Sequence, residues 1–225
     1  MTDRTAGPAA DLASDPVAAA PAPAAVDVPA AGPVPRAVPA TGGPRATRPL
    51  NICVFLSAAD LPERYTAPAR EFGGLLGRAG HTLVWGGSES GLMKVVADGA
   101  QEAGGRLVGV SVEFLRAKAR AGADEMVIAP DLAARKAELL RRSDAIVVMV
   151  GGTGTLDEAT EILELKKHGL HAKPVVVLNS AGFYDGLAAQ FRRMEAEGFL
   201  PLPLSELVHF SDDGADALAY LQEHA

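Results

Sequence analysis

A glycine-rich loop followed by a carboxylate is the part of this sequence best suited to chemistry. The stretch Gly151-Gly152-Thr153-Gly154-Thr155-Leu156-Asp157-Glu158 follows an apolar run that ends at Val150. Glycines let the backbone turn tightly and point its N–H groups outward with no Cβ in the way. A helix that begins here adds a partial positive charge and free N–H donors. The pattern predicts a cradle for a phosphate, and the plain alternative is a tight turn that binds nothing.

Glu158 has two interpretations on spacing alone. Thr155-x-x-Glu158 fits a capping box, in which each side chain satisfies an orphan N–H at a helix start. Alternatively, the carboxylate lies one helical turn beyond the phosphate cradle, near the anomeric carbon of a bound nucleotide. There it would stabilise an oxocarbenium-like transition state or orient the attacking water. The two roles exclude each other only if the cap uses the whole carboxylate.

A second glycine-rich turn runs from Gly86 and Gly87 to Gly91-Leu92-Met93. It could wrap the sugar or the base of a nucleotide, and a plain turn is the alternative. Arg135 and Lys136 lie early in another predicted helix, where charged pairs usually face solvent. Cations so near a helix N-terminus oppose the helix dipole, which hints that they face an anion instead.

Short apolar runs alternate with helix-patterned stretches from Asn51 onward. The predicted strands are Ile52–Leu56, Thr82–Trp85, Arg106–Val110, Met126–Ile128, Ala145–Val150, Val175–Leu178 and Leu207–Phe210. The predicted helices lie near Ala67–Ala79, Leu92–Ala103, Leu132–Arg142, Leu156–His168, Asp185–Glu197 and Ala215–Gln222.

This alternation predicts a Rossmann-like, doubly wound α/β fold, a parallel sheet with helices on both faces. Ligands of such sheets bind at the carboxyl ends of the strands, where both glycine-rich turns lie. Residues 1–48 are rich in Ala and Pro and lack any period that could bury a face, so we expect a disordered tail. The nucleotide-binding domain is expected over residues 49–225.

Composition narrows the classes of function. The 225 residues carry a net charge of −7, which disfavours partners such as nucleic acid or an anionic membrane. The single cysteine, Cys53, lies in an apolar run and is expected in the core rather than as a nucleophile. No apolar run approaches the roughly 18 residues needed to span a bilayer, and we see no secretory signal. His168 and His171 lack partners at ligand spacing, so no metal is expected. The single cysteine and the lack of a span or signal together lead us to expect the protein in the cytoplasm.

From Asn51 to its C-terminus the chain resembles the Lonely Guy family, the cytokinin riboside 5′-monophosphate phosphoribohydrolases once labelled lysine decarboxylases. The family hallmark is Pro-Gly-Gly-x-Gly-Thr-x-x-Glu, and residues 151–158 match all of it except the leading proline, here Val150. Arg135-Lys136 match the end of its Met-His-x-Arg-Lys motif. Residues 86–93 match its Gly-Gly-Gly-x-x-Gly-Leu-Met turn, apart from the third glycine.

The resemblance implies a homodimer that hydrolyses a nucleoside 5′-monophosphate, AMP or an N6-modified AMP, to free base and ribose 5-phosphate without a cofactor or metal. Its catalytic pair carries over to Arg135 and Glu158, which favours the catalytic interpretation of Glu158. The expected substrate-binding residues are Gly86, Gly87, Lys136, Gly151, Gly152, Thr153, Gly154 and Thr155.

The chain departs from the family pattern around the expected site. The positions concerned are Leu56, Ser57, Ser88, Glu89, Lys94, Leu132 and Ala133. Such changes fit retained chemistry on an altered base or sugar, or a decaying site. A non-catalytic carrier or sensor of a nucleotide or cofactor, similar in fold to molybdenum-cofactor carriers, is the alternative function. The presence of both Arg135 and Glu158 argues against it, because a carrier needs neither.

Overall fold

The computed structural model of this chain describes residues 48–225. The predicted Ala/Pro-rich tail, residues 1–48, therefore lies outside the described residues except for its last member, Arg48.

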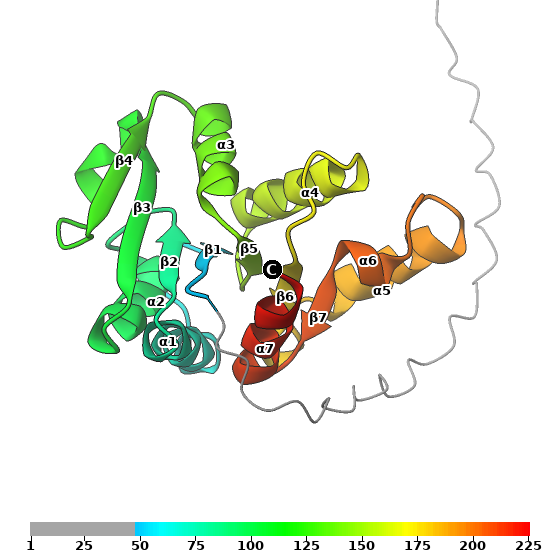
Figure 1. The fold of residues 1–225 in the computed structure, drawn as a ribbon, viewed down its shortest axis with the longest axis horizontal. Helices are drawn as coiled ribbons and strands as arrows, with labels where there is room; N and C mark the ends of the chain where they lie inside the picture. Colours follow the sequence, from blue (N-terminus) through cyan, green and yellow to red (C-terminus); the bar gives the residue numbers. More distant parts are fainter. Residues whose placement is uncertain (1–47) are drawn as a thin grey trace, which may run out of the picture. The chain divides into compact units, whose positions relative to one another are not determined.

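A seven-stranded sheet forms the centre of the described region (Figure 1). Its strands are β1 (Asn51–Phe55), β2 (Thr82–Trp85), β3 (Arg106–Val112), β4 (Glu125–Ala129), β5 (Ala145–Val148), β6 (Val175–Leu178) and β7 (His209–Ser211). Their order is β4-β3-β2-β1-β5-β6-β7, and every neighbouring pair is parallel. The predicted doubly wound α/β class is confirmed.

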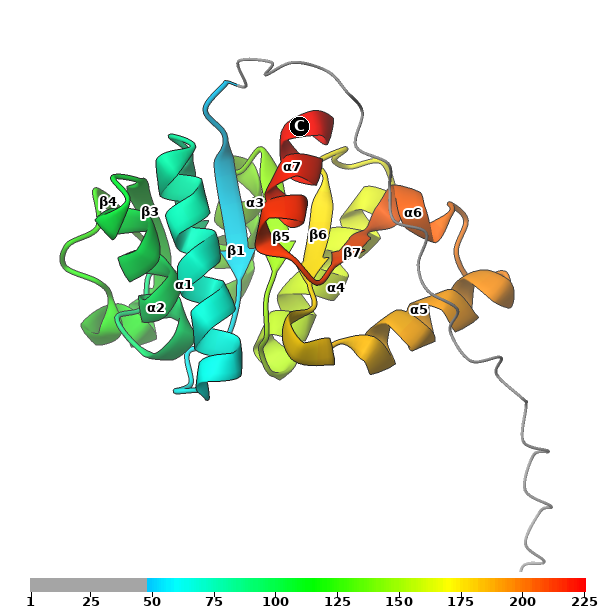
Figure 2. The same cartoon turned by 90° about the horizontal axis from the view of Figure 1, so that it is seen from below.

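Helices cover both faces of this sheet, as Figures 1 and 2 show. One face carries α1 (Glu63–Arg78), α2 (Gly91–Glu102) and α7 (Gly214–His224), and the other carries α3 (Leu132–Arg142), α4 (Thr153–Lys167), α5 (Asp185–Ala196) and α6 (Leu204–Leu207). Two short 3₁₀ helices, η1 (Glu113–Lys118) and η2 (Ser180–Gly182), complete the described elements.

The strands are apolar throughout because both faces of the sheet are buried. In β1, Ile52 and Val54 pack into the apolar cluster shared with α1, α2 and α7. Cys53 and Phe55 point the other way, into the cluster under α3 and α4. Cys53 is fully buried, and burial raises the pKa of its thiol, so the prediction of a core cysteine is confirmed.

The strand order reverses between β1 and β5, and this point locates the site. The chain steps from β1 outward to β4 on one side and from β5 outward to β7 on the other. In open parallel sheets, ligands bind in the crevice at the carboxyl ends of the strands beside such a switch point. Here the loop after β1 and the loop after β5 are joined directly, because the Ser57 amide donates to the Val150 carbonyl at 3.0 Å.

Within residues 48–225, none of the helices is both long enough and apolar enough to cross a membrane.

Candidate active site

The glycine-rich loop leaves β5 at the switch point and enters α4. Gly152 is the N-cap residue of α4 and brings no capping side chain. Gly152, Thr153 and Gly154 are exposed, and a Cβ built on Gly152 or Gly154 would have no neighbour within 4 Å. The first turn of α4 therefore presents its N–H groups beside open space, as a phosphate cradle requires.

Thr155 is buried, whereas Thr153 is exposed. The Thr155 side chain lies against Gly151, where an added Cβ would overlap the Thr155 hydroxyl and stand 2.5 Å from its Cβ. Gly151 must therefore lack a side chain for the loop to close over Thr155. Thr153 is the exposed hydroxyl of the loop.

The capping-box interpretation of Glu158 is wrong. Helix α4 begins at Thr153 rather than near Leu156, so Thr155 is its third residue and Glu158 its sixth. A capping box would need Thr155 at the N-cap itself. The Glu158 carboxylate instead accepts a hydrogen bond from Arg135 Nη1 at 2.5 Å.

Arg135 reaches this carboxylate from the first turn of α3. The Asp131 side chain caps that helix by accepting from the Ala134 amide at 2.8 Å. Arg135 Nε donates to the Val110 carbonyl of β3 at 2.9 Å. The side chains of Arg135 and Glu158 are only 11% and 9% exposed, so the pair is largely removed from water. The structure thus brings together the two residues predicted to be catalytic.

Burial sets the proton affinity of Glu158. Loss of solvent raises the pKa of its carboxyl group above the ordinary value, and the neighbouring Arg135 charge opposes that rise. A carboxylate with a raised pKa is a stronger base toward a water molecule.

Lys136 also faces α4 instead of open solvent. Its ammonium group pairs with Asp157 at 3.0 Å and with Glu161. The solvated-face interpretation of Arg135 and Lys136 is therefore wrong, and the anions that they face are carboxylates of the next helix. A role for Lys136 in substrate binding stays a prediction.

The second glycine-rich turn forms a wall against Arg135. A Cβ on Gly86 would overlap the Arg135 guanidinium and lie 2.9 Å from the Met93 methyl group. The turn is paired with the segment after η1, because Arg120 N donates to Gly87 O at 2.8 Å and Glu89 N to Lys118 O at 2.9 Å. The sequence alone gave no indication of this pairing, since nothing in residues 118–120 fits a strand.

The N-terminus of α2 is occupied by the chain itself. Leu92 N donates to the Ala59 carbonyl and Met93 N to the Ser57 carbonyl, each at 3.2 Å. The loop after β1, where Leu56 and Ser57 depart from the family pattern, therefore uses donors that a ligand would otherwise find. This leaves the start of α4 as the open helix end beside the Arg135–Glu158 pair.

Tyr184 holds the segment that leads into the glycine-rich loop. Its hydroxyl donates to the carbonyl of Met149, two residues before Gly151, at 2.9 Å. Burial raises the pKa of Tyr184 to about 12, so the phenol remains a donor at neutral pH. The sequence pattern around Tyr184 matched the family without indicating this contact.

Comparison with known proteins places the chain among close relatives. The family described as "Possible lysine decarboxylase" matches residues 93–221. A probable cytokinin riboside 5′-monophosphate phosphoribohydrolase from Oryza sativa subsp. japonica is 36% identical over 186 residues, 81% of this chain and 82% of that protein. A cytokinin riboside 5′-monophosphate phosphoribohydrolase from Mycobacterium tuberculosis is 34% identical over 169 residues, 74% of this chain and 90% of that protein.

Solved structures of similar fold include molybdenum-cofactor proteins. The molybdenum cofactor binding protein from Rippkaea orientalis superposes with a TM-score of 0.62 at 20% identity, over 78% of this chain and 97% of that chain. The Moco carrier protein from Chlamydomonas reinhardtii does so with a TM-score of 0.59 at 28% identity, over the same shares.

Proposed function

Because the chain belongs to the cytokinin riboside 5′-monophosphate phosphoribohydrolase family, we propose that it hydrolyses the N-glycosidic bond of a nucleoside 5′-monophosphate. The substrate is AMP or an N6-modified adenylate, and the products are the free base and ribose 5-phosphate. The observation that carries this proposal is the buried Arg135–Glu158 pair beside an open glycine-rich loop at the switch point of the sheet.

The 5′-phosphate binds at the N-terminus of α4, where the backbone N–H groups of Gly152, Thr153 and Gly154 and the Thr153 hydroxyl donate to its oxygens. Glu158 lies on the same helix, four residues beyond Gly154. Four residues rise about 6 Å along a helix, comparable to the reach from a 5′-phosphate to the anomeric carbon of its ribose.

The reaction needs one general base, which is Glu158, and one water molecule. Glu158 takes a proton from the water, whose oxygen bonds to the anomeric carbon, and the electron pair of the broken C–N bond stays on the base nitrogen. The leaving nucleobase takes up a proton at that nitrogen, and Glu158 gives the proton that it received back to solvent. Arg135 holds Glu158 in place and offers positive charge to a substrate hydroxyl or phosphate oxygen.

The pairing of Arg135 with Glu158 suits this role because it orients the carboxylate before the substrate arrives. A side chain held by a fixed partner loses little freedom when the reaction begins.

The test is incubation of the full chain with a panel of nucleoside 5′-monophosphates, following free base and ribose 5-phosphate by chromatography. We expect release from AMP or a modified adenylate by the wild type and none by Glu158→Gln, with nucleotide binding kept in the variant. Glu164→Gln is the matched control, because Glu164 lies on the same helix but is exposed and pairs with Lys167 and His168. Release that persists unchanged in Glu158→Gln would refute the assignment of the base.

A carrier function is the second candidate, and the 28% identity to the Chlamydomonas reinhardtii Moco carrier protein favours keeping it. Calorimetry on the same nucleotide panel separates the two functions. Tight binding of one ligand with no product from any member would support the carrier.

We further propose that residues 49–225 act as a cytoplasmic homodimer without nucleic-acid or membrane partners. The family resemblance supports the dimer, and the net charge of −7 and the single buried cysteine support the rest. Light scattering coupled to size exclusion would give twice the chain mass of 23.2 kDa, and a single chain mass would contradict the dimer.

A further inference from the structure

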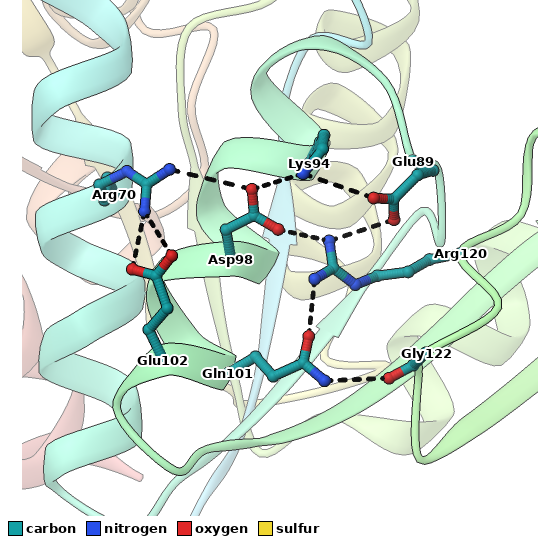
Figure 3. A network of polar contacts seen from close by, with 8 residues as sticks. All are labelled: Arg70, Glu89, Lys94, Asp98, Gln101, Glu102, Arg120 and Gly122. Carbon is teal, nitrogen blue, oxygen red and sulfur yellow. Dashed lines mark hydrogen bonds and ion pairs between the residues drawn. The ribbon is translucent and has the colours of Figure 1, made fainter.

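Eight residues on α1, α2, the second glycine-rich turn and the segment after η1 form one polar network (Figure 3). Arg120 is at its centre, with ion pairs to Asp98 at 2.7 Å and to Glu89 at 3.1 Å. Its guanidinium also donates to the Gln101 side chain at 2.6 Å. The Arg120 side chain is only 10% exposed and that of Asp98 16%, whereas the Glu89 side chain is 42% exposed.

Lys94 completes the link between the turn and α2. Its ammonium group pairs with Asp98 at 2.7 Å and with Glu89 at 3.4 Å. Burial alone would raise the pKa of Asp98, but the bonds from Lys94 and Arg120 outweigh it and lower that pKa. The carboxylate therefore keeps its charge, and the two cations stay fixed on either side of it.

The network lies directly behind the wall of the proposed active site. Glu89 belongs to the turn that begins at Gly86, and Gly86 lies against the guanidinium of Arg135. Arg120 holds this turn twice, through its side chain on Glu89 and through its backbone amide on Gly87. A short antiparallel bridge between Ser88 and Ala119 lies between these two contacts.

We propose that Arg120 is a positioning residue, which holds the Gly86–Ser90 turn against Arg135 and so fixes the guanidinium on Glu158. This inference rests on the proposed function of Arg135 and Glu158. Arg120 itself touches no reacting atom. It acts through the turn, and Glu89 and Lys94, two departures from the family pattern, are the residues that couple the turn to it.

The test compares Arg120→Gln, Arg120→Lys and the control Arg116→Gln in the full chain. Arg116 lies on η1, is exposed and pairs only with Glu113 among the described residues. Because misplacement of a catalytic group by about 1 Å can cost on the order of 100-fold in rate, we expect Arg120→Gln to lower kcat for AMP at least ~10-fold. KM should change by less than ~3-fold, Arg120→Lys should recover part of the loss, and Arg116→Gln should match the wild type.

A purely structural role would lower the melting temperature and leave kcat unchanged well below it, which would overturn the proposal. A second measurement does not depend on activity. The losses of unfolding free energy in Arg120→Gln and Arg135→Lys, measured without substrate, should not sum in the double variant, because the two residues share the turn. Additive losses would overturn the positioning role, whereas a wild type that releases no product would refute the proposed function alone.

Discussion

Replacing Arg135 by Lys tests whether the planar guanidinium, rather than positive charge alone, organises the site. The guanidinium makes two bonds at once, from Nε to the Val110 carbonyl at 2.9 Å and from Nη1 to Glu158 at 2.5 Å. An ammonium group at the end of a flexible chain has no such fork. It can stay with Glu158, and the buried Val110 carbonyl then loses its donor.

The magnitude follows from that one lost bond. A buried acceptor left without a donor costs about 1–3 kcal/mol, so we expect Arg135→Lys to be about 2 kcal/mol less stable. For a domain of this size, that corresponds to a fall in Tm of roughly 4–8 °C. The less constrained charge should also lower kcat/KM for AMP by about 10- to 100-fold.

Chemical denaturation and steady-state release of ribose 5-phosphate measure both quantities. Arg141→Lys is the matched control, because Arg141 lies on the same helix but is exposed and pairs with Glu138. An Arg135→Lys variant with wild-type stability and wild-type kcat/KM would refute the argument from the fork.

Four further outcomes follow from the contacts of Glu158, Glu138 and Gly151. Burial raises the pKa of Glu158 above 4.5, so kcat/KM should fall as the pH drops through that raised value, with an acid limb above 4.5. An acid limb of kcat/KM at or below pH 4.5 would contradict the raised pKa. The same shift means that the contribution of this carboxyl to stability is present below pH 4.5 and is lost as the pH rises through the folded-state pKa. The opposite sign holds for Glu138, whose pKa is lowered from 4.5 to about 2, first of all by the bond from Arg141. Its partly exposed ion pairs should contribute about 1 kcal/mol above pH 4.5, and the difference between wild type and Glu138→Gln in urea denaturation should shrink toward pH 2. Gly151→Ala should weaken AMP binding in calorimetry, since the new Cβ would overlap Thr155, whereas the control Gly186→Ala on α5 meets open space and should bind as the wild type does.

The fold could be predicted from the sequence because burial on two faces leaves a plain pattern. Runs such as Ala145-Ile146-Val147-Val148 have no polar face, and only a covered parallel strand uses such a run economically. Helix boundaries were less certain, because α1 begins at Glu63 behind Pro62 rather than near Ala67. The one-turn elements α6, η1 and η2 were missed, since they are too short to show a period.

Some features of the site could likewise be predicted from local sequence, and others depend on the folded structure. The exposed turn at Gly152–Gly154 was predictable because glycines between a strand and a helix let the backbone turn tightly. Glu158 was ambiguous because a shift of a few residues in the start of α4 decides between a cap and a free carboxylate. The contact of Glu158 with Arg135 spans 23 residues, and only the folded sheet brings the two helices together.

We infer that the departures at Glu89 and Lys94 alter the site rather than record its decay. Decay accumulates changes that are independent of one another, and a new charge would then stand without a partner. Here Glu89 and Lys94 pair with each other at 3.4 Å, Glu89 also pairs with Arg120, and Lys94 also pairs with Asp98. These pairs lie behind the turn whose Gly86 touches Arg135, where a change of contacts can alter the shape of the proposed substrate site.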